Sequence, residues 1–141
     1  MTLRTVEDLL VGRPLIGVTG CFTVAAACHR MREHGVGALA VVEGQRLIGI
    51  LSERDVAVRV IAGHRDPMLT LVREVMTREP RTVPAHAVIP EALRAMLAGG
   101  FRHMPVTRGA TAIGMLSMRD VQAEGDGPVG CTWQAPILAL G

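Results

Sequence analysis

Two stretches of this chain carry the apolar periodicity of an amphipathic helix, with apolar residues at positions i, i+3, i+4 and i+7. In the first stretch these residues are Val24, Ala27, Cys28 and Met31. In the second stretch they are Ile89, Ala92, Leu93 and Met96. Thr23 precedes the first stretch as an N-cap, and Gly35 and Gly99–Gly100 follow the two stretches as stop signals. The pattern predicts two short helices.

Each predicted helix is followed by two apolar runs that a tight, Gly-containing turn separates. The runs span residues 38–42 and 47–51, and residues 103–106 and 112–116. Such pairs of runs predict β-hairpins. A short leading strand is expected near Gly17–Val18 and near Thr82–Val83, and a second helix is expected after Ser52 and after Ser117. Each half of the chain is therefore predicted to be a β-α-β-β-α unit.

The two halves are copies of one another. Residues 17–56 align with residues 82–121 without a gap, and 13 of the 40 aligned positions are identical. The segments before them, 6–14 and 72–80, also match. A single unit would leave an apolar sheet face in water, at a cost of roughly 25 cal/mol per Å² of apolar surface. We therefore predict an α+β fold in which tandem β-α-β-β-α repeats pack about a pseudo-twofold axis.

The repeat also sets the expected boundaries along the chain. These are residues 1–62 for the first repeat with its leading segment, 63–76 for the connector, 77–124 for the second repeat, and 125–141 for the tail. A helix is expected over residues 70–75 of the connector. The tail carries apolar side chains among Pro and Gly, so we expect it to dock on the chain's own surface or on a partner.

Composition and charge exclude several classes of function. The net charge is +2, with acidic residues between the arginines, so no nucleic acid partner is expected. Phe22, Phe101 and Trp133 are the aromatic residues, too few for a base-stacking platform. Apolar runs of about seven residues fall short of the ~20 that a membrane helix needs, and no membrane contact is expected. The first ten residues lack a secretory apolar region, so we expect a cytoplasmic location.

The three cysteines have no metal-ligand spacing. Cys28 falls on the apolar stripe of a predicted helix, and we expect it to be a buried, inert thiol. Cys21 and Cys131 could pair if the tail folds back, although a reducing cytosol favours free thiols.

The most specific repeated feature is a strand followed by Ser-x-Arg-Asp and a helix, at Ser52–Asp55 and Ser117–Asp120. In a capping box, the Ser hydroxyl accepts from the Asp amide and the Asp carboxylate accepts from the Ser amide. The same geometry could cradle a nucleotide, because a helix N-terminus and an Arg fork attract phosphate while a carboxylate accepts from ribose hydroxyls. The cap explains neither the Arg nor the Gly near the end of each strand. Both interpretations stay open.

Several motifs together resemble a CBS-domain pair, or Bateman module. They are the tandem β-α-β-β-α units, the Gly-h-h-Ser-x-x-Asp ending with h apolar, Gly-Phe-Arg-His-Met-Pro-Val at residues 100–106, and Arg-Asp-Pro at residues 65–67. The resemblance covers roughly residues 5–123. It implies a disc with a cleft on each side between the repeats, where many members bind AMP, ADP, ATP or S-adenosylmethionine. Members also often form homodimers.

Roles for single residues follow from the resemblance, position by position. Asp55 and Asp120 would hold the ribose. The phosphates would bind to Ser52, Arg54, Ser117 and Arg119. The base would lie against Thr82, Val83, Arg102, His103 and Met104, largely at backbone groups, with Pro105 beside them. The equivalent places in the first copy belong to Val18, Ala38 and Leu39.

The two copies differ at these positions. The first copy has Ala40 in place of Pro105, Gly37-Ala38 in place of Arg102-His103, and Gly17 in place of Thr82. We therefore predict one dominant nucleotide site per chain, in the second copy, with the first copy weak or empty.

Other signals carry no chemistry. Residues 35–40 match the G-x-G-x-x-A dinucleotide fingerprint, but they end a helix and open a strand, which is the reverse of its context. The five histidines lack metal-site spacing, and His29, His34, His64 and His86 are expected at the surface. His103 is either beside the base pocket or a plain strand histidine. No nucleophile elbow or free carboxylate pair is visible, so no enzyme is predicted.

The function predicted from the sequence is an energy or metabolite sensor with no required cofactor. A nucleotide would bind between the repeats and shift their packing, and an unknown downstream protein would respond to the shift. The rival is a ligand-free dimerisation scaffold in which the Ser-x-Arg-Asp corners are only helix caps.

Overall fold

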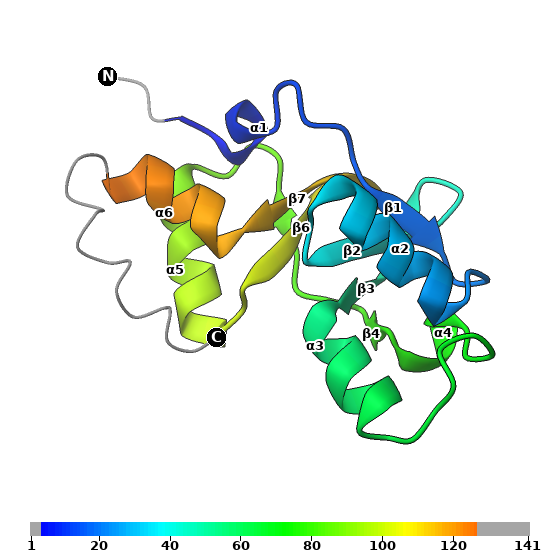
Figure 1. Ribbon diagram of the computed structural model, residues 1–141. Coiled ribbons are helices and arrows are strands. Elements are labelled where there is room, and N and C mark those ends of the chain that lie inside the picture. Colours follow the sequence, from blue (N-terminus) through cyan, green and yellow to red (C-terminus); the bar gives the residue numbers. More distant parts are fainter. Residues whose placement is uncertain (1–3, 127–141) are drawn as a thin grey trace.

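The computed structural model describes residues 4–126 of the chain (Figure 1). Its helices are α1 (Val6–Leu9), α2 (Val24–His34), α3 (Glu53–Asp55), the π-helical segment η1 (Val56–Ile61), α4 (Val72–Val75), α5 (Ile89–Gly99) and α6 (Met118–Asp126). Its strands are β1 (Gly17–Thr19), β2 (Ala38–Glu43), β3 (Arg46–Ser52), β4 (Thr77–Arg78), β5 (Val83–Pro84), β6 (His103–Arg108) and β7 (Thr111–Ser117). Both predicted β-α-β-β-α units are present, each preceded by a four-residue helix.

The two long helices lie where the apolar pattern predicts them. In α2 the Thr23 hydroxyl accepts from the Ala26 amide at 3.1 Å. Gly35 ends α2 in the left-handed conformation with a φ of 64°, and Gly100 ends α5 in the same way with a φ of 71°. Cys28 and Leu93 are partly buried, and the other residues of the two apolar stripes are buried, namely Val24, Ala27, Met31, Ile89, Ala92 and Met96. Each stripe covers one face of its own repeat's strands.

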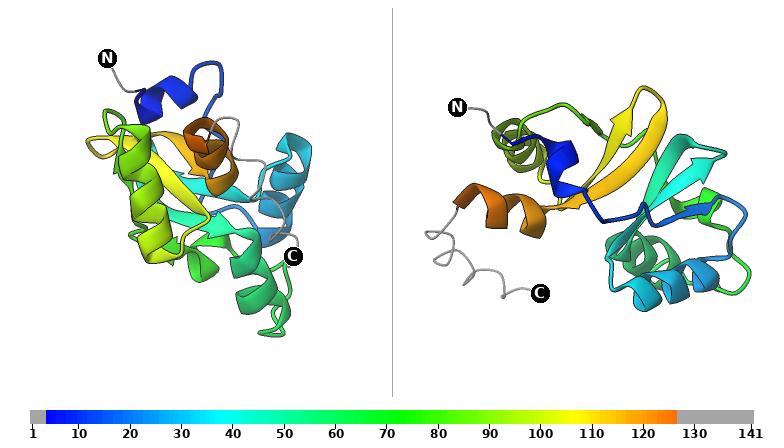
Figure 2. Two further views of the ribbon diagram at one scale, coloured as in Figure 1. Left: turned by 90° about the vertical axis from the view of Figure 1, so that its left-hand side faces the viewer. Right: turned by 90° about the horizontal axis from the view of Figure 1, so that it is seen from above.

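A single seven-stranded sheet runs through both repeats in the order β1-β2-β3-β7-β6-β5, with β4 paired to β3. The two hairpins join near their tips, where the Leu47 amide donates to the Ala110 carbonyl and the Ala112 amide donates to the Gln45 carbonyl, both at 3.1 Å. Leu47 and Ala112 occupy equivalent positions in the two repeats, and so do Gln45 and Ala110. The two bonds are therefore related by a pseudo-twofold axis that passes between the repeats. The α+β prediction is confirmed, and two lobes lie on either side of this junction (Figure 2).

The segments that precede the repeats, residues 6–14 and 72–80, are exchanged between the lobes, and we call them the lead-ins. The Val6 amide donates to Ala87 of the second repeat, and the Val72 amide donates to Phe22 of the first. The lead-ins also supply core residues to the lobes that they cross to. Val6 and Leu9 pack in the second-repeat cluster, while Val72, Val75 and Met76 pack in the first-repeat cluster. Each lobe is therefore completed by chain from outside its own repeat.

The connector is an ordered crossover. The Asp66 carboxylate accepts from the Met68 amide, and the Asp66 carbonyl accepts from the Thr70 amide, both at 2.9 Å. The helix predicted over residues 70–75 begins later, at Val72. Thr70 is buried, and its carbonyl accepts from the Val24 amide at 2.8 Å, which holds this part of the connector extended against α2. No helix among residues 4–126 is long and apolar enough to cross a membrane.

The glycine near the end of each hairpin has a packing role. A Cβ on Gly49 would lie 2.6 Å from the Met76 sulfur and 2.9 Å from the Thr77 carbonyl oxygen. A Cβ on Gly114 would lie 2.6 Å from a methyl carbon of Leu10. These glycines give the exchanged lead-ins room to cross the strands, so the repeated Gly does not require a ligand to explain it.

The two glycines differ in what a side chain would meet, and this gives a matched test. Gly49→Ala pushes against backbone, so we expect it to lower the free energy of unfolding by about 1–3 kcal/mol. Gly114→Ala meets only the end of a flexible Leu side chain, and we expect a loss below about 1 kcal/mol. Urea unfolding of both variants measures this, and equal losses would contradict the described packing.

Candidate functional site

The Ser52–Asp55 corner opens α3 and forms a complete capping box. The Ser52 hydroxyl accepts from the Asp55 amide at 3.1 Å, and the Asp55 carboxylate accepts from the Ser52 amide at 2.9 Å. The second carboxylate oxygen accepts from the Thr77 hydroxyl at 3.3 Å. Only 12% of the Asp55 side chain is exposed. The carboxylate is therefore already engaged by the protein.

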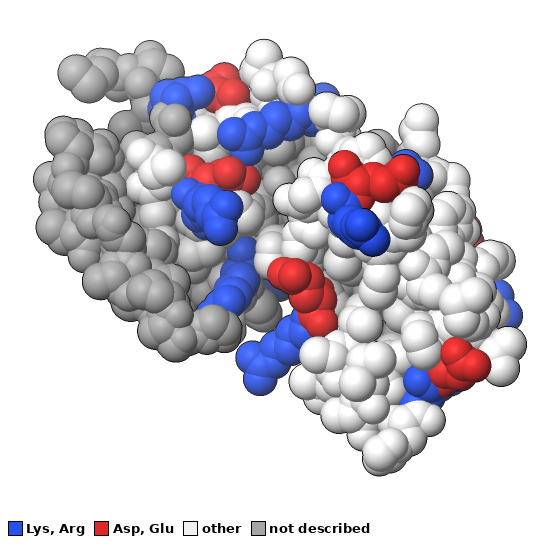
Figure 3. All heavy atoms as spheres, viewed as in Figure 1, with Lys and Arg blue, Asp and Glu red and all other residues white. Residues whose placement is uncertain are grey.

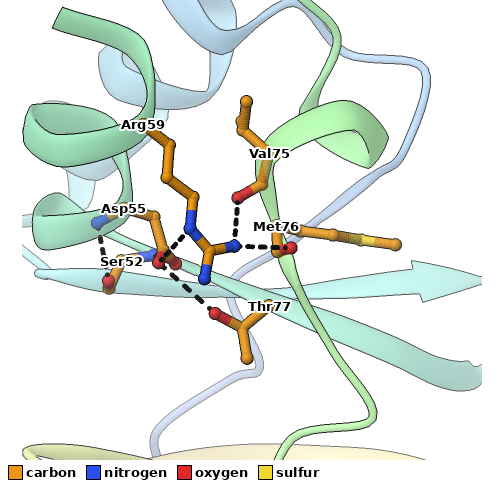
Figure 4. A network of polar contacts seen from close by, with 6 residues as sticks. All are labelled: Ser52, Asp55, Arg59, Val75, Met76 and Thr77. Atoms are coloured by element: carbon orange, nitrogen blue, oxygen red, sulfur yellow. Dashed lines mark hydrogen bonds and ion pairs between the residues drawn. The ribbon is translucent and has the colours of Figure 1, made fainter. Parts of the chain in front are cut away.

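Arg59 completes this network, which Figure 4 shows from close by. Its Nε lies 3.9 Å from the Asp55 carboxylate, one turn earlier in the same helix. Its Nη1 donates to the carbonyls of Val75 and Met76, at 3.0 and 3.1 Å, where α4 ends. The first-copy corner thus fastens the α3 and η1 segment to the exchanged lead-in.

The Ser117–Asp120 corner opens α6 and is held differently. The Ser117 hydroxyl accepts from the Asp120 amide at 3.2 Å, as in a cap. The Asp120 carboxylate lies 3.1 Å from Nη1 of Arg13, and 26% of its side chain is exposed. By repeat position Val11 replaces Thr77, and a valine side chain cannot donate the hydrogen bond that Thr77 gives to Asp55. Asp120 is therefore the more accessible carboxylate of the two.

His103 lies where the two repeats meet. A Cβ on Gly37 would lie 3.3 Å from Nε2 of His103 and 2.5 Å from a carboxylate oxygen of Glu53. Burial lowers the pKa of His103, and the nearby Arg102 guanidinium lowers it further, while the Glu53 and Asp120 carboxylates oppose this shift. His103 pairs with Ser117 across β6 and β7, and the Arg102 carbonyl accepts from the Met118 amide, so both residues lie at the Ser117–Asp120 corner. Glu53 of the first repeat and His103 both approach Gly37.

The helix starts face the starts of the central strands in both repeats. The Glu53 amide donates to the Gly37 carbonyl at 3.0 Å, and the Met118 amide donates to the Arg102 carbonyl at 2.8 Å. Figure 3 shows acidic and basic side chains on both walls of the opening between the lobes. The exposed guanidinium groups of Arg54, Arg102 and Arg119 make no hydrogen bond or ion pair with any residue that the structure describes. These groups are available to an anion.

Pro105 changes the edge of the second repeat. In the first repeat the Ala40 amide donates to the Ile16 carbonyl at 3.3 Å, and β1 pairs with β2 over three residues. Pro105 has no amide hydrogen, so the equivalent bond to Arg81 is impossible, and β5 pairs with β6 over two residues. A Cβ on Gly17 would lie 3.1 Å from the Ala40 carbonyl oxygen, so the closer strand pairing explains Gly at that position.

The predicted site residues do not all gather in one place. A hollow of about 390 Å³ lies beside α5, and Thr82 and Val83 are among its lining residues, with Arg81, Pro84, His86, Ala87, Glu91 and Ala95. The corner residues Ser117 and Asp120 do not line it. Five other predicted site residues have buried side chains, namely Val18, Ala38, Leu39, Met104 and Pro105. Any contact from these five to a ligand would have to come from backbone groups.

Sequence reasoning missed the residues that hold the two aspartates, namely Arg13, Arg59 and Thr77. Arg59 was visible as the i+4 partner of Asp55. Arg13 and Thr77 come from the lead-ins, and placing them required knowledge of the exchange.

Cysteine and histidine side chains offer no further site in the described part of the chain. Cys28 is partly buried, less than expected, and burial raises the pKa of its thiol. Cys21 is exposed and accepts from Nη1 of Arg73 at 3.7 Å, while Cys131 lies outside the described residues. The exposed histidines are those predicted at the surface: His29, His34, His64 and His86. Within residues 4–126 no group of three or more His, Cys, Asp or Glu could hold a metal ion.

The environment of His103 predicts a pH dependence of stability. Burial lowers the pKa of His103 in the folded state, so the unfolded chain binds the proton more tightly. The contribution of neutral His103 to the free energy of unfolding is complete above the unfolded-state pKa of about 6.5. It is lost as pH falls below that value, by at most about 1.4 kcal/mol per pH unit. We expect urea unfolding of His103→Gln to depend less on pH than wild type below about pH 6.5. Parallel profiles would contradict this.

Comparison with known proteins identifies the family. The model of the CBS domain matches residues 6–61 and 72–125. The Arabidopsis thaliana protein CBSCBSPB2 is 39% identical over 116 residues, which are 82% of this chain and 22% of that protein, so the chain spans about a fifth of that relative's length. A solved CBS-domain protein of Burkholderia ambifaria MC40-6 is 34% identical, with a TM-score of 0.79, covering 86% of this chain and 93% of that one. The chain belongs to the CBS domain family and folds as a CBS-domain pair.

Proposed function

We propose that this protein is a regulatory module that binds an adenosine-containing nucleotide, AMP, ADP, ATP or S-adenosylmethionine, between its two CBS repeats. The Ser117–Asp120 corner is the principal site. The observation that carries the proposal is a partly exposed carboxylate in the first turn of α6, close to His103 and Arg102 at the junction of the repeats. Two hydroxyls on one sugar are suitable donors to such a carboxylate.

Solved structures of this fold support the ligand class. A CBS-domain protein of Pyrobaculum aerophilum, 23% identical with a TM-score of 0.75, is complexed with AMP. The CBS-domain pair of protein MJ0100, 20% identical with a TM-score of 0.80, is in complex with 5′-methylthioadenosine and S-adenosylmethionine. These identities show the fold alone, so the ligand of this chain is proposed from its own residues.

The chemistry of the corner suits a nucleotide. A phosphate group next to the start of α6 would meet the positive end of the helix dipole and the Arg119 amide, because the Met118 and Asp120 amides already donate to Arg102 and Ser117. The exposed Arg119 and Arg102 are available for charge-assisted hydrogen bonds to it. The base would lie along the backbone near Thr82 and Val83. In the first repeat the Ile16 carbonyl accepts from the Ala40 amide, but Pro105 cannot donate such a bond to the equivalent Arg81 carbonyl. The ligand would act as a regulatory signal, with no cofactor required.

The first-copy corner is the weaker candidate for a site. Asp55 is engaged by Ser52, Thr77 and Arg59, and a ribose would have to displace these contacts. We therefore propose one dominant site per chain. Nucleotide binding would change how the lobes pack, and a homodimer partner or a downstream protein would respond to that change.

The second candidate function is a ligand-free scaffold. The observation that favours it is that both Ser hydroxyls cap their helices, so both corners have a structural use without a ligand. In that case the repeats would serve dimerisation alone.

A thermal shift assay separates the two functions. With AMP, ATP or S-adenosylmethionine at about 100 times its dissociation constant, binding adds about 2.7 kcal/mol to the stability of the folded state. We expect a raised melting temperature with at least one of them. No shift with any of the three would favour the scaffold.

Paired aspartate variants test the assignment of the site. Asp120→Ala removes the proposed ribose acceptor, and we expect nucleotide affinity to fall at least about tenfold by calorimetry. Asp55→Ala removes the carboxylate half of the capping box and the Arg59 network but keeps the Ser52 cap, so we expect a loss of about 1–2 kcal/mol in stability with affinity nearly unchanged. Unaltered binding in Asp120→Ala, or two equal sites in wild type, would refute the assignment.

A further inference from the structure

Arg13 connects the exchanged lead-in to the proposed nucleotide site. It follows the turn at the end of α1, in which Gly12 has a φ of 78° and the Arg13 amide donates to the Leu10 carbonyl at 2.9 Å. Because the lead-in crosses to the second lobe, the Arg13 side chain reaches the first turn of α6. Its Nη1 lies 3.1 Å from the Asp120 carboxylate.

This ion pair has no counterpart in the first copy. The lead-in position that matches Arg13 is Glu79, whose side chain is exposed and carries the opposite charge. The Arg13–Asp120 pair is therefore not part of the repeated framework. It belongs to the one corner whose carboxylate is accessible.

The pair is also built to separate easily. The Arg13 side chain is 56% exposed, so water screens its side of the ion pair and weakens the attraction to Asp120, which is 26% exposed. Its guanidinium has five donors, while the carboxylate contact uses Nη1, so further donors remain for a second anion. A phosphate at the start of α6 would lie within one turn of Asp120, where the same side chain can turn to it.

We propose that Arg13 is an exchangeable counter-ion that sets the selectivity of the site for phosphorylated ligands. This rests on the proposed function. In the empty site Arg13 neutralises Asp120. When ribose hydroxyls bind the carboxylate, Arg13 moves to the ligand phosphate. A nucleoside also displaces the arginine, but it has no phosphate to which Arg13 can bind. Because Arg13 follows α1, its movement from Asp120 to the phosphate also links occupancy of the site to α1, which packs in the core of the second lobe.

The test compares adenosine with AMP by calorimetry in wild type and Arg13→Met, which keeps the length of the side chain. Wild type is expected to bind AMP more tightly than adenosine. In Arg13→Met adenosine no longer competes with an ion pair, so its affinity rises up to about fivefold. AMP loses a charge-assisted bond, so the ratio of the adenosine to the AMP dissociation constant falls at least about tenfold.

The control is Arg108→Met. Arg108 is also an exposed arginine that joins the second repeat to the same lead-in, through an ion pair with Glu7 of α1. It lies at the end of β6 away from the Ser117–Asp120 corner, so the ratio should stay at the wild-type value. Urea unfolding of both variants checks that they are equally folded.

The outcomes are separable. If wild type binds neither AMP nor adenosine, this inference fails, and the proposed function fails with it only if ATP and S-adenosylmethionine also give no thermal shift. If wild type binds AMP and adenosine but the ratio is unchanged in Arg13→Met, Arg13 is an ordinary surface ion pair and the proposed function stands alone. Equal weakening of both ligands in Arg13→Met would show a structural role and would also overturn the inference.

Discussion

Neither repeat of this chain can bury its own apolar surface, and the exchange of lead-ins is the interaction that resolves this. Val6 and Leu9 are core residues of a lobe that follows them by some 80 positions, and Val72 and Val75 are core residues of the lobe before them. The exchange ties the two lobes into one folding unit. It also brings the lead-in side chains to the helix starts, where the two aspartates lie.

The exchange makes the two corners chemically different although their motifs are the same. In one lobe the lead-in brings Thr77 to Asp55, and Arg59 closes a network that uses the carboxylate fully. In the other lobe the lead-in brings a single flexible Arg13 to Asp120. Identical Ser-x-Arg-Asp sequences thus give one corner suited to structure and one suited to an exchangeable ligand.

Much of the fold could be predicted from the sequence because the signals are local. The helices around Val24 and Ile89, the hairpins, and the left-handed stops at Gly35 and Gly100 all follow from periodicity and backbone preference. The late start of α4 could not be predicted, because a tertiary bond between Val24 and Thr70 decides it.

The candidate site was harder to predict, because its geometry depends on contacts distant in the sequence. The asymmetry between the copies was visible in Pro105 and Ala40. The stronger cause of the asymmetry is that Asp55 and Asp120 have different partners, and this was not visible in the sequence. The repeated glycine looked like a functional signal, and the packing of Met76 and Leu10 against Gly49 and Gly114 explains it without a ligand.

A co-crystal structure with AMP tests the central claim most directly, since it locates the ligand relative to both corners at once. The account predicts one nucleotide per chain, with ribose hydroxyls on the Asp120 carboxylate, phosphate at the start of α6, and Arg13 turned away from Asp120. A nucleotide held only by Asp55, or an empty junction between the lobes at saturating AMP, would contradict it.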